Sequence, residues 1–171
     1  ALPIARMRKA HVVILRLTEK LLREVGSPTP TVTTSTTLLG DWTGALLIIG
    51  RRQFILLISE HSRLPVLMPV RDRKHLARRF PAALAPVLRL LSVPEDAVER
   101  EIEASREGVI ARTNSRSLLG TLTDFSFLLS HYLRGTGEVD LVEAALWLSR
   151  TPVGPLGHQR PYDVARRLLG A

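Results

Sequence analysis

Four runs of apolar residues in the first 70 positions are separated by short polar stretches. The runs cover residues 11–17, 42–49, 53–59 and 64–70. Each is rich in β-branched and aliphatic residues and is short for a helix, which predicts strands. The middle two are joined by the corner Gly50-Arg51-Arg52 and are predicted to form a hairpin. Because these two runs are almost continuously apolar, we expect strands that are buried on both faces.

A short helix and a loop are predicted between the first two strands. Thr18 is a candidate cap for a helix over residues 19–25, and Gly26 is suited to ending it. Residues 27–39 contain two prolines and six threonines and have no helical period. This composition predicts an exposed surface loop.

The rest of the chain has mainly helical periodicity. Asp72 is a candidate cap for a helical region that extends to Leu91, but Pro81 and Pro86 lie inside it. Because proline lacks an N–H and clashes with the preceding turn, we expect one helix before Pro81 and another after it. The remaining predicted elements are a helix from Pro94, a strand at 108–113, and helices at 117–133, 140–150 and 162–169.

This order of elements predicts an α+β fold. We expect a mixed sheet of about five strands, covered mainly by helices. The length of 171 residues is typical of one domain. We therefore expect a single domain over residues 11–171, preceded by a flexible N-terminal tail over residues 1–10.

Two features of the composition indicate a cytoplasmic protein without a membrane span. The chain has no cysteine, which excludes disulfides and thiol chemistry and fits a reducing compartment. The longest apolar stretch, residues 42–58, is divided by Arg51, Arg52 and Gln53, so it predicts two strands. The apolar run at residues 12–15 follows basic residues but is too short for the core of a signal peptide.

The strongest compositional signal is the formal net charge of +8. Such a charge favours polyanionic partners such as nucleic acid or anionic lipid. The alternative is a purely compositional charge, since the arginines are spread along the chain and 16 acidic residues accompany them. One basic segment is dense enough to predict phosphate contacts, and it consists of Arg71, Arg73, Lys74, Arg78 and Arg79.

A second candidate anion site lies where the predicted strand at 108–113 leads into a helix. Arg112 and Arg116 flank this turn, and arginines beside the first N–H groups of a helix can bind phosphate. Asp124 follows two helical turns later and would complete an enzyme site for an anionic or phosphorylated small molecule. The alternative is a capping loop in which Arg116 pairs with Asp124.

Motifs for metal or covalent chemistry are absent from the sequence. The five histidines are scattered and have no metal-ligand spacing, and no G-x-S-x-G segment occurs. Gly135-Thr136-Gly137 lacks the residues of a phosphate-binding loop and predicts a turn between helices. We therefore expect no metal and no cofactor. An acidic run accompanied by Arg100 and Arg106 predicts a solvated helix face; it consists of Glu95, Asp96, Glu99, Glu101 and Glu103.

Three segments together resemble a known family. They are VVILRLTEKLL, GDWTGALLIIGRRQFILLISEHSRLPVL and ARTNSRSLLGTLTDF, in this order. The chain resembles a small bacterial family of domains of unknown function, whose members have an RLTxKLL helix, a DW pair before a hairpin, and RSxLGxxxD. The resemblance implies an independently folding domain and no particular activity. The matching positions are Asp41, Trp42, Arg116, Ser117, Gly120 and Asp124.

Three hypotheses about function follow. The first is a non-enzymatic binding or regulatory protein that contacts nucleic acid through phosphate, since 5% aromatic residues argue against base stacking. The second is an enzyme acting on an anionic small molecule at Arg112, Arg116 and Asp124. The third is a protein-interaction module, either one half of an operon-encoded pair or a homodimer. Trp42 is predicted to anchor the core at the start of a strand, and Asp41 is predicted to end the loop before that strand.

Overall fold

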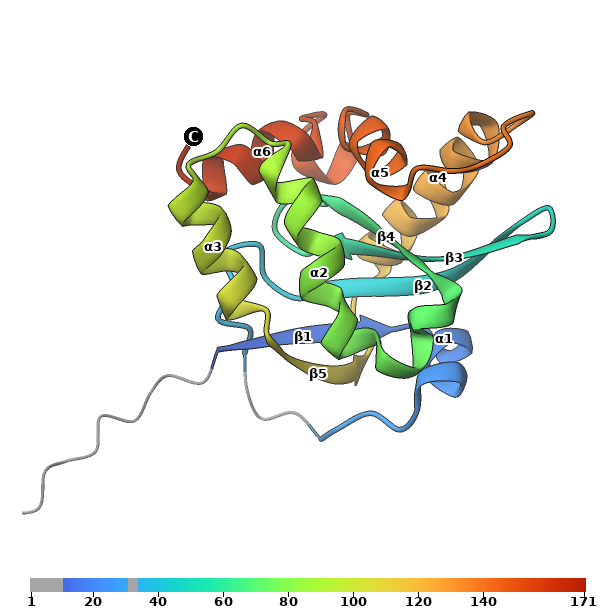
Figure 1. Ribbon diagram of the computed structural model, residues 1–171, viewed down its shortest axis with the longest axis horizontal. Coiled ribbons are helices and arrows are strands. Elements are labelled where there is room, and N and C mark those ends of the chain that lie inside the picture. Colours follow the sequence, from blue (N-terminus) through green and yellow to red (C-terminus); the bar gives the residue numbers. More distant parts are fainter. Residues whose placement is uncertain (1–10, 31–33) are drawn as a thin grey trace, which may run out of the picture.

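Five strands form one mixed sheet in the computed structural model, which describes residues 11–30 and 34–171 (Figure 1). Their order across the sheet is β4-β3-β2-β1-β5. The predicted tail at residues 1–10 lies outside the described residues, as do residues 31–33 of the predicted loop. The strands are β1 (Val12–Leu17), β2 (Trp42–Ile49), β3 (Arg52–Ser59), β4 (Pro65–Pro69) and β5 (Glu107–Arg112).

The sheet combines an antiparallel part with a parallel part. β2, β3 and β4 follow one another as an antiparallel meander, and the hairpin between β2 and β3 is confirmed. β1 lies parallel to β2, with Leu15 beside Trp42, and parallel to β5, with Val12 beside Glu107. Strands from distant parts of the sequence therefore meet at one side of the sheet, where β5 is the edge strand. The predicted α+β fold in one domain is confirmed.

Helices cover both faces of the sheet. In Figure 1, α2 and α3 lie in front of the strands and α4 lies behind them, while α5 runs beside β4. Among the described residues, no helix is both long and apolar enough to cross a membrane. The helices are α1 (Glu19–Val25), η1 (Val70–His75), α2 (Leu76–Arg89), α3 (Glu95–Ala104), α4 (Arg116–Tyr132), α5 (Leu141–Ser149), η2 (Gly154–Leu156) and α6 (Pro161–Leu168).

The predicted break at Pro81 is wrong, because α2 is one helix that contains both Pro81 and Pro86. Asp72 does not cap it; this residue lies in the short 3-10 helix η1, which leads directly into α2. One face of α2 packs into the core, and the burial of this face offsets the cost of the two prolines. The buried residues of α2 are Leu76, Phe80, Leu84, Val87 and Leu88.

The core between the sheet and α2 is centred on Trp42. Its side chain is fully buried, and its ring meets the ring of Phe80 edge to face, with 5.1 Å between the ring centroids. On the other face of the sheet, Phe125 of α4 is also fully buried. Trp42 is therefore the core anchor that its position at the start of a strand predicts.

The predicted exposed loop is partly built into the fold. Thr36 Oγ1 accepts the N–H of Val12 at 3.0 Å, and Ser35 Oγ accepts the N–H of Ile14 at 2.9 Å. These two side chains continue the hydrogen bonding of β1 beyond its short pairing with β2. Thr37 and Leu39 are buried, so the prediction of an exposed loop is wrong for this end of the segment.

The prediction of a solvated acidic face on α3 is wrong for Glu101. Its side chain is buried, and its two carboxylate oxygens accept the N–H groups of Leu38 at 3.0 Å and Leu39 at 3.1 Å. Burial raises the pKa of Glu101, while these hydrogen bonds and the nearby His61 act in the opposite direction. The carboxylate thus fastens the loop before β2 to α3.

Gly108 of β5 allows the first turn of α2 to lie close against the sheet. A Cβ at this position would lie 2.7 Å from Ala77 Cβ and 3.1 Å from Ala77 Cα. Because the second contact is with backbone, we expect Gly108→Ala to lower the free energy of unfolding by about 1–3 kcal/mol, measured by urea denaturation. Gly137→Ala provides a control, since a Cβ there would meet nothing within 4 Å. An equal effect of both substitutions would contradict the argument.

Candidate functional site

The basic segment lies on η1 and the first turns of α2. Arg71, Lys74, Arg78 and Arg79 are exposed, and within the described part of the chain they have no ion pair with an acidic side chain. Arg73 differs, because its Nε lies 3.1 Å from Glu24 Oε2 and its Nη1 donates to the carbonyl of Val70. Four of the five predicted cations therefore remain free for a ligand, and Arg73 instead joins η1 to α1.

Two cations of the basic segment, Lys74 and Arg78, line one surface hollow of about 310 Å³ together with His75; we name it the basic hollow. It lies where the first turn of α2 packs against β5, so the close contact between Gly108 and Ala77 helps to fix its floor. Lys74 and Arg78 are four residues apart, a spacing that places side chains on the same side of a helix. The lining residues are Val25, Lys74, His75, Leu76, Ala77, Arg78 and Ile110.

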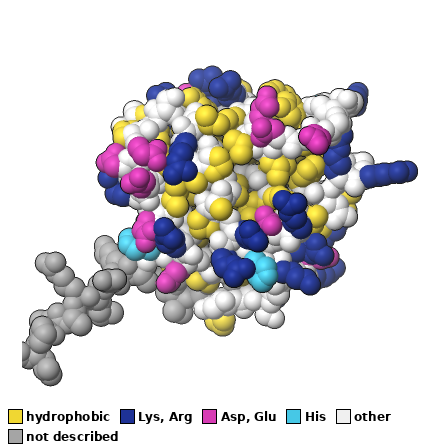
Figure 2. All heavy atoms as spheres, in the orientation of Figure 1, with side chains coloured by type: hydrophobic (Ala, Val, Ile, Leu, Met, Phe, Trp, Pro, Cys, Tyr) yellow, Lys and Arg dark blue, Asp and Glu magenta, His cyan; other side chains and the backbone are white. Residues whose placement is uncertain are grey.

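Charge is distributed unevenly over this face of the molecule. Figure 2 shows basic side chains along the edge that carries η1, α1 and the tip of the β2–β3 hairpin in Figure 1. The largest group of acidic side chains in this view lies on the opposite side, over α3, and other acidic side chains are scattered over the rest of the face. On α3, Asp96 pairs with Arg100 at 2.8 Å, and Glu103 pairs with Arg106. The cations near α3 are thus neutralised locally, whereas most of those in the basic segment are not.

The second predicted anion site is not assembled as one unit. Arg112 forms an ion pair with Glu19 of α1 and lines a hollow beside Arg16 and Asn114. Arg116 is exposed at the first position of α4. The described residues include no Arg116–Asp124 ion pair, so the pairing that we considered as an alternative is absent. Ser115 does cap α4, since its Oγ accepts the N–H of Leu118 at 3.2 Å.

The side chain of Asp41 has a structural role. Its carboxylate accepts from Arg16 Nε and from Ser35 Oγ, both at 2.7 Å, and so links β1 to the loop before β2. Arg16 Nη1 also donates to the carbonyl of Arg112 at 3.2 Å. Both residues of the Asp41-Trp42 pair therefore stabilise the fold. Asp41 forms hydrogen bonds where β2 begins beside β1, and Trp42 packs in the core.

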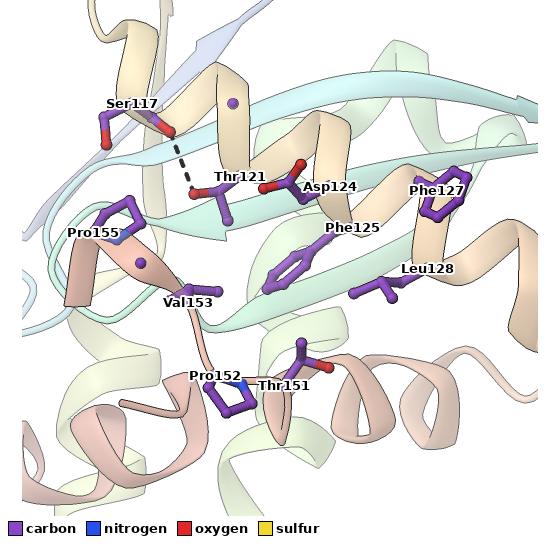
Figure 3. A pocket seen from close by; sticks show the side chains of 12 residues that line it. Ser117, Thr121, Asp124, Phe125, Phe127, Leu128, Thr151, Pro152, Val153 and Pro155 are labelled. Carbon is purple, nitrogen blue, oxygen red and sulfur yellow. Dashed lines mark hydrogen bonds between the residues drawn. The ribbon is translucent and has the colours of Figure 1, made fainter. Parts of the chain in front are cut away.

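Three of the matching positions, Ser117, Gly120 and Asp124, line a different hollow, which has a volume of about 520 Å³. We name it the α4 hollow. Figure 3 shows that α4 forms one wall and that the segment from Thr151 to Pro155 forms the other. Spacings of three and four residues place these side chains on one face of α4. The spacing of these residues in the sequence could identify this face of α4. It could not show that the segment from Thr151 to Pro155 lies opposite.

Arg63 holds Ser117, one of the residues that line the α4 hollow, and the sequence analysis did not predict this role. Its side chain is buried, and its Nη2 donates to Ser117 Oγ at 3.0 Å. Burial lowers the pKa of Arg63, against the opposing effect of Glu60. The backbone of Arg63 has a φ of 59°, which is uncommon for a residue with a side chain. No motif marks it, because it lies in the β3–β4 turn, far along the chain from Ser117.

The described residues include no group of three metal-ligating side chains. In a comparison with known protein families, the model of a family described as a domain of unknown function, DUF6933, matches residues 14–164. Searches of the curated proteins and of the solved structures found no match.

Proposed function

We propose that this chain, which belongs to the DUF6933 family, is a non-enzymatic nucleic-acid-binding protein. The description of the family assigns no activity, so the proposal rests on the residues of this chain. The contacts would be made to the phosphate backbone by Arg71, Lys74, Arg78 and Arg79. The observation that carries this proposal is the basic hollow. There, Lys74 and Arg78 converge on one surface, and neither pairs with an acidic side chain in the described residues.

Cations without an acidic partner can bind phosphate at a lower cost in free energy than cations that already form ion pairs. An arginine that is already paired must give up its partner before it can bind phosphate, whereas Lys74 and Arg78 need not do so. Each phosphate that a basic side chain neutralises releases counterions, and this release is the main source of sequence-independent affinity. A cluster of such side chains beside the start of a helix therefore favours a polyanion over a single small anion.

The chemistry of the basic segment also indicates which part of a nucleic acid it contacts. Arginine and lysine bind phosphate oxygens well, and such contacts position a protein without reading sequence. Base stacking has little support in the basic hollow, because its lining includes no Phe, Tyr or Trp and its one aromatic ring is that of His75. We therefore propose binding with little sequence preference. Arg116, which is exposed, is a candidate for one further phosphate contact.

A combined charge reversal tests the proposal. The variant Arg71→Glu/Lys74→Glu/Arg78→Glu is expected to bind fluorescent duplex DNA or single-stranded RNA about 100-fold more weakly, because three phosphate contacts become repulsive. Its plot of log affinity against log salt concentration should also be less steep, by about 2–3 for duplex DNA. Fluorescence anisotropy across a salt series measures both quantities.

A second triple variant controls for net charge. Arg89→Glu/Arg100→Glu/Arg106→Glu changes the formal charge by the same amount, but these arginines are exposed and pair with Glu95, Asp96 and Glu103. It is expected to retain most of the affinity and the steep salt dependence. Equal losses in both variants would mean that only total charge matters, and no binding by the unmodified protein at low salt would exclude the proposal.

A further inference from the structure

The α4 hollow has the size and the lining of a site for a small organic molecule. Its volume of about 520 Å³ lies within the usual range for such sites. Most of its lining is apolar. In Figure 3, Phe125 and Leu128 point from α4 toward the opposite wall, where Val153 and Pro152 lie. An apolar ligand body placed here would be held between a helix and a loop.

Gly120 keeps the hollow open. A Cβ added at this position would meet nothing within 4 Å, and the backbone of Gly120 has no positive φ that would require glycine. Glycine inside a helix weakens it relative to alanine, so neither packing nor backbone geometry accounts for its presence. Its bare backbone does, however, leave room for a ligand against the middle of α4.

The charge of the hollow is opposite to that of the protein. Asp124 is the single ionisable residue among those that line it, in a chain with a formal net charge of +8. Its carboxylate is exposed and has neither a hydrogen bond nor an ion pair within the described residues. Phe127, one turn further along α4, is 65% exposed. Phe127 also lines the hollow, with its ring edge to face against His131. A carboxylate in a hollow that aromatic rings also line is suited to a cation, since both groups attract positive charge.

Ser117 provides a second polar group at the other end of the hollow. Its Oγ accepts a hydrogen bond from the buried Arg63, which leaves the hydroxyl hydrogen free to donate. Ser117 and Asp124 are seven residues apart on α4, which corresponds to about 10 Å along the helix axis. The hollow therefore offers a donor at one end and a carboxylate at the other, with apolar side chains between them.

We propose that the α4 hollow binds a small organic cation with an aromatic or aliphatic body and one ammonium group. The ammonium group pairs with Asp124, and the body packs on Phe125, Leu128 and Val153. This site is separate from the basic segment and does not depend on nucleic-acid binding. A charged group of the opposite sign, such as a carboxylate, is disfavoured because it would face Asp124.

Three matched probes test the ligand chemistry. They are 2-phenylethylammonium, the neutral 2-phenylethanol and the anionic 3-phenylpropionate, which share an aromatic ring on a short chain. Ligand-observed NMR titrations of the full chain should show the cation binding about two- to fivefold more tightly than the alcohol, and the anion binding most weakly. Equal affinities, or a preference for the anion, would overturn the proposal.

Two substitutions locate the binding. Asp124→Asn should remove the preference for the cation, whereas Glu99→Gln, which removes an equal charge from an exposed position on α3, should leave it intact. Gly120→Leu should fill the hollow and abolish binding of the cation while the melting temperature stays equal or rises, because leucine favours helix. Unchanged binding in either Asp124→Asn or Gly120→Leu would place the probe elsewhere and overturn the proposal.

Discussion

Replacing Trp42 by alanine is expected to lower the free energy of unfolding by about 3–5 kcal/mol, the usual cost of removing a large buried aromatic side chain. The side chain is fully buried and fills the space between β2 and α2, where its ring contacts Phe80. The alanine variant would leave a cavity that Phe80 cannot fill without moving α2. Urea denaturation followed by circular dichroism measures the change.

Two further substitutions separate burial from other effects. Trp42→Phe should cost less, about 1–2 kcal/mol, because it retains a ring and removes an indole N–H that is buried without a partner in the described structure. Phe127→Ala removes an aromatic ring that is 65% exposed and should change stability by less than about 1 kcal/mol. A small effect of Trp42→Ala would contradict its role as the core anchor.

Replacing Glu101 by alanine is expected to lower the free energy of unfolding by about 2–4 kcal/mol. The substitution removes two hydrogen bonds to a carboxylate and leaves the N–H groups of Leu38 and Leu39 without acceptors. The release of a buried charge offsets part of this loss. Glu99→Ala is the matched control, since Glu99 is exposed on the same helix and should have little effect.

Glu101 also gives the stability a pH dependence of unusual sign. Burial raises its pKa above the ordinary value of 4.5, so the folded protein holds this proton more strongly than the unfolded chain does. The stabilisation from the protonated carboxyl is complete below about pH 4.5 and is lost as the pH rises through the raised pKa. The free energy of unfolding of the native protein minus that of Glu101→Gln should therefore fall as the pH increases from about 4.5. A rising difference would contradict the argument.

The strands were predictable because their residues are apolar almost without interruption. Buried strands with this pattern leave few alternatives, and the corner at Gly50 marks the hairpin between two of them. The cap of α5 was also visible, since Asp140 accepts the N–H groups of Val142 and Glu143 as an N-cap residue should. The neighbours of β1 were not predictable, because a pattern along one strand does not specify which strands lie beside it.

The errors of the sequence analysis have a common physical cause, which is tertiary packing. Local rules end a helix at Pro81, but burial of Phe80 and Leu84 keeps α2 intact around it. Local rules also place Glu101 in solvent with its acidic neighbours, whereas its partners are backbone groups of Leu38 and Leu39. The same limit applies to the candidate sites, since the sequence identified the basic segment but not the role of Arg63.

The position of β1 in the sheet affects how the chain folds during its synthesis. β1 is the first strand of the described chain, yet its full length pairs with β5, where Val12 lies beside Glu107 and Leu17 beside Arg112. Contacts between such distant residues slow folding, because a long loop must close before they form. During synthesis on the ribosome, one edge of β1 stays unpaired until β5 has emerged. A nascent chain stalled before β5 would expose an apolar strand edge, which is the kind of surface that chaperones bind and that starts aggregation.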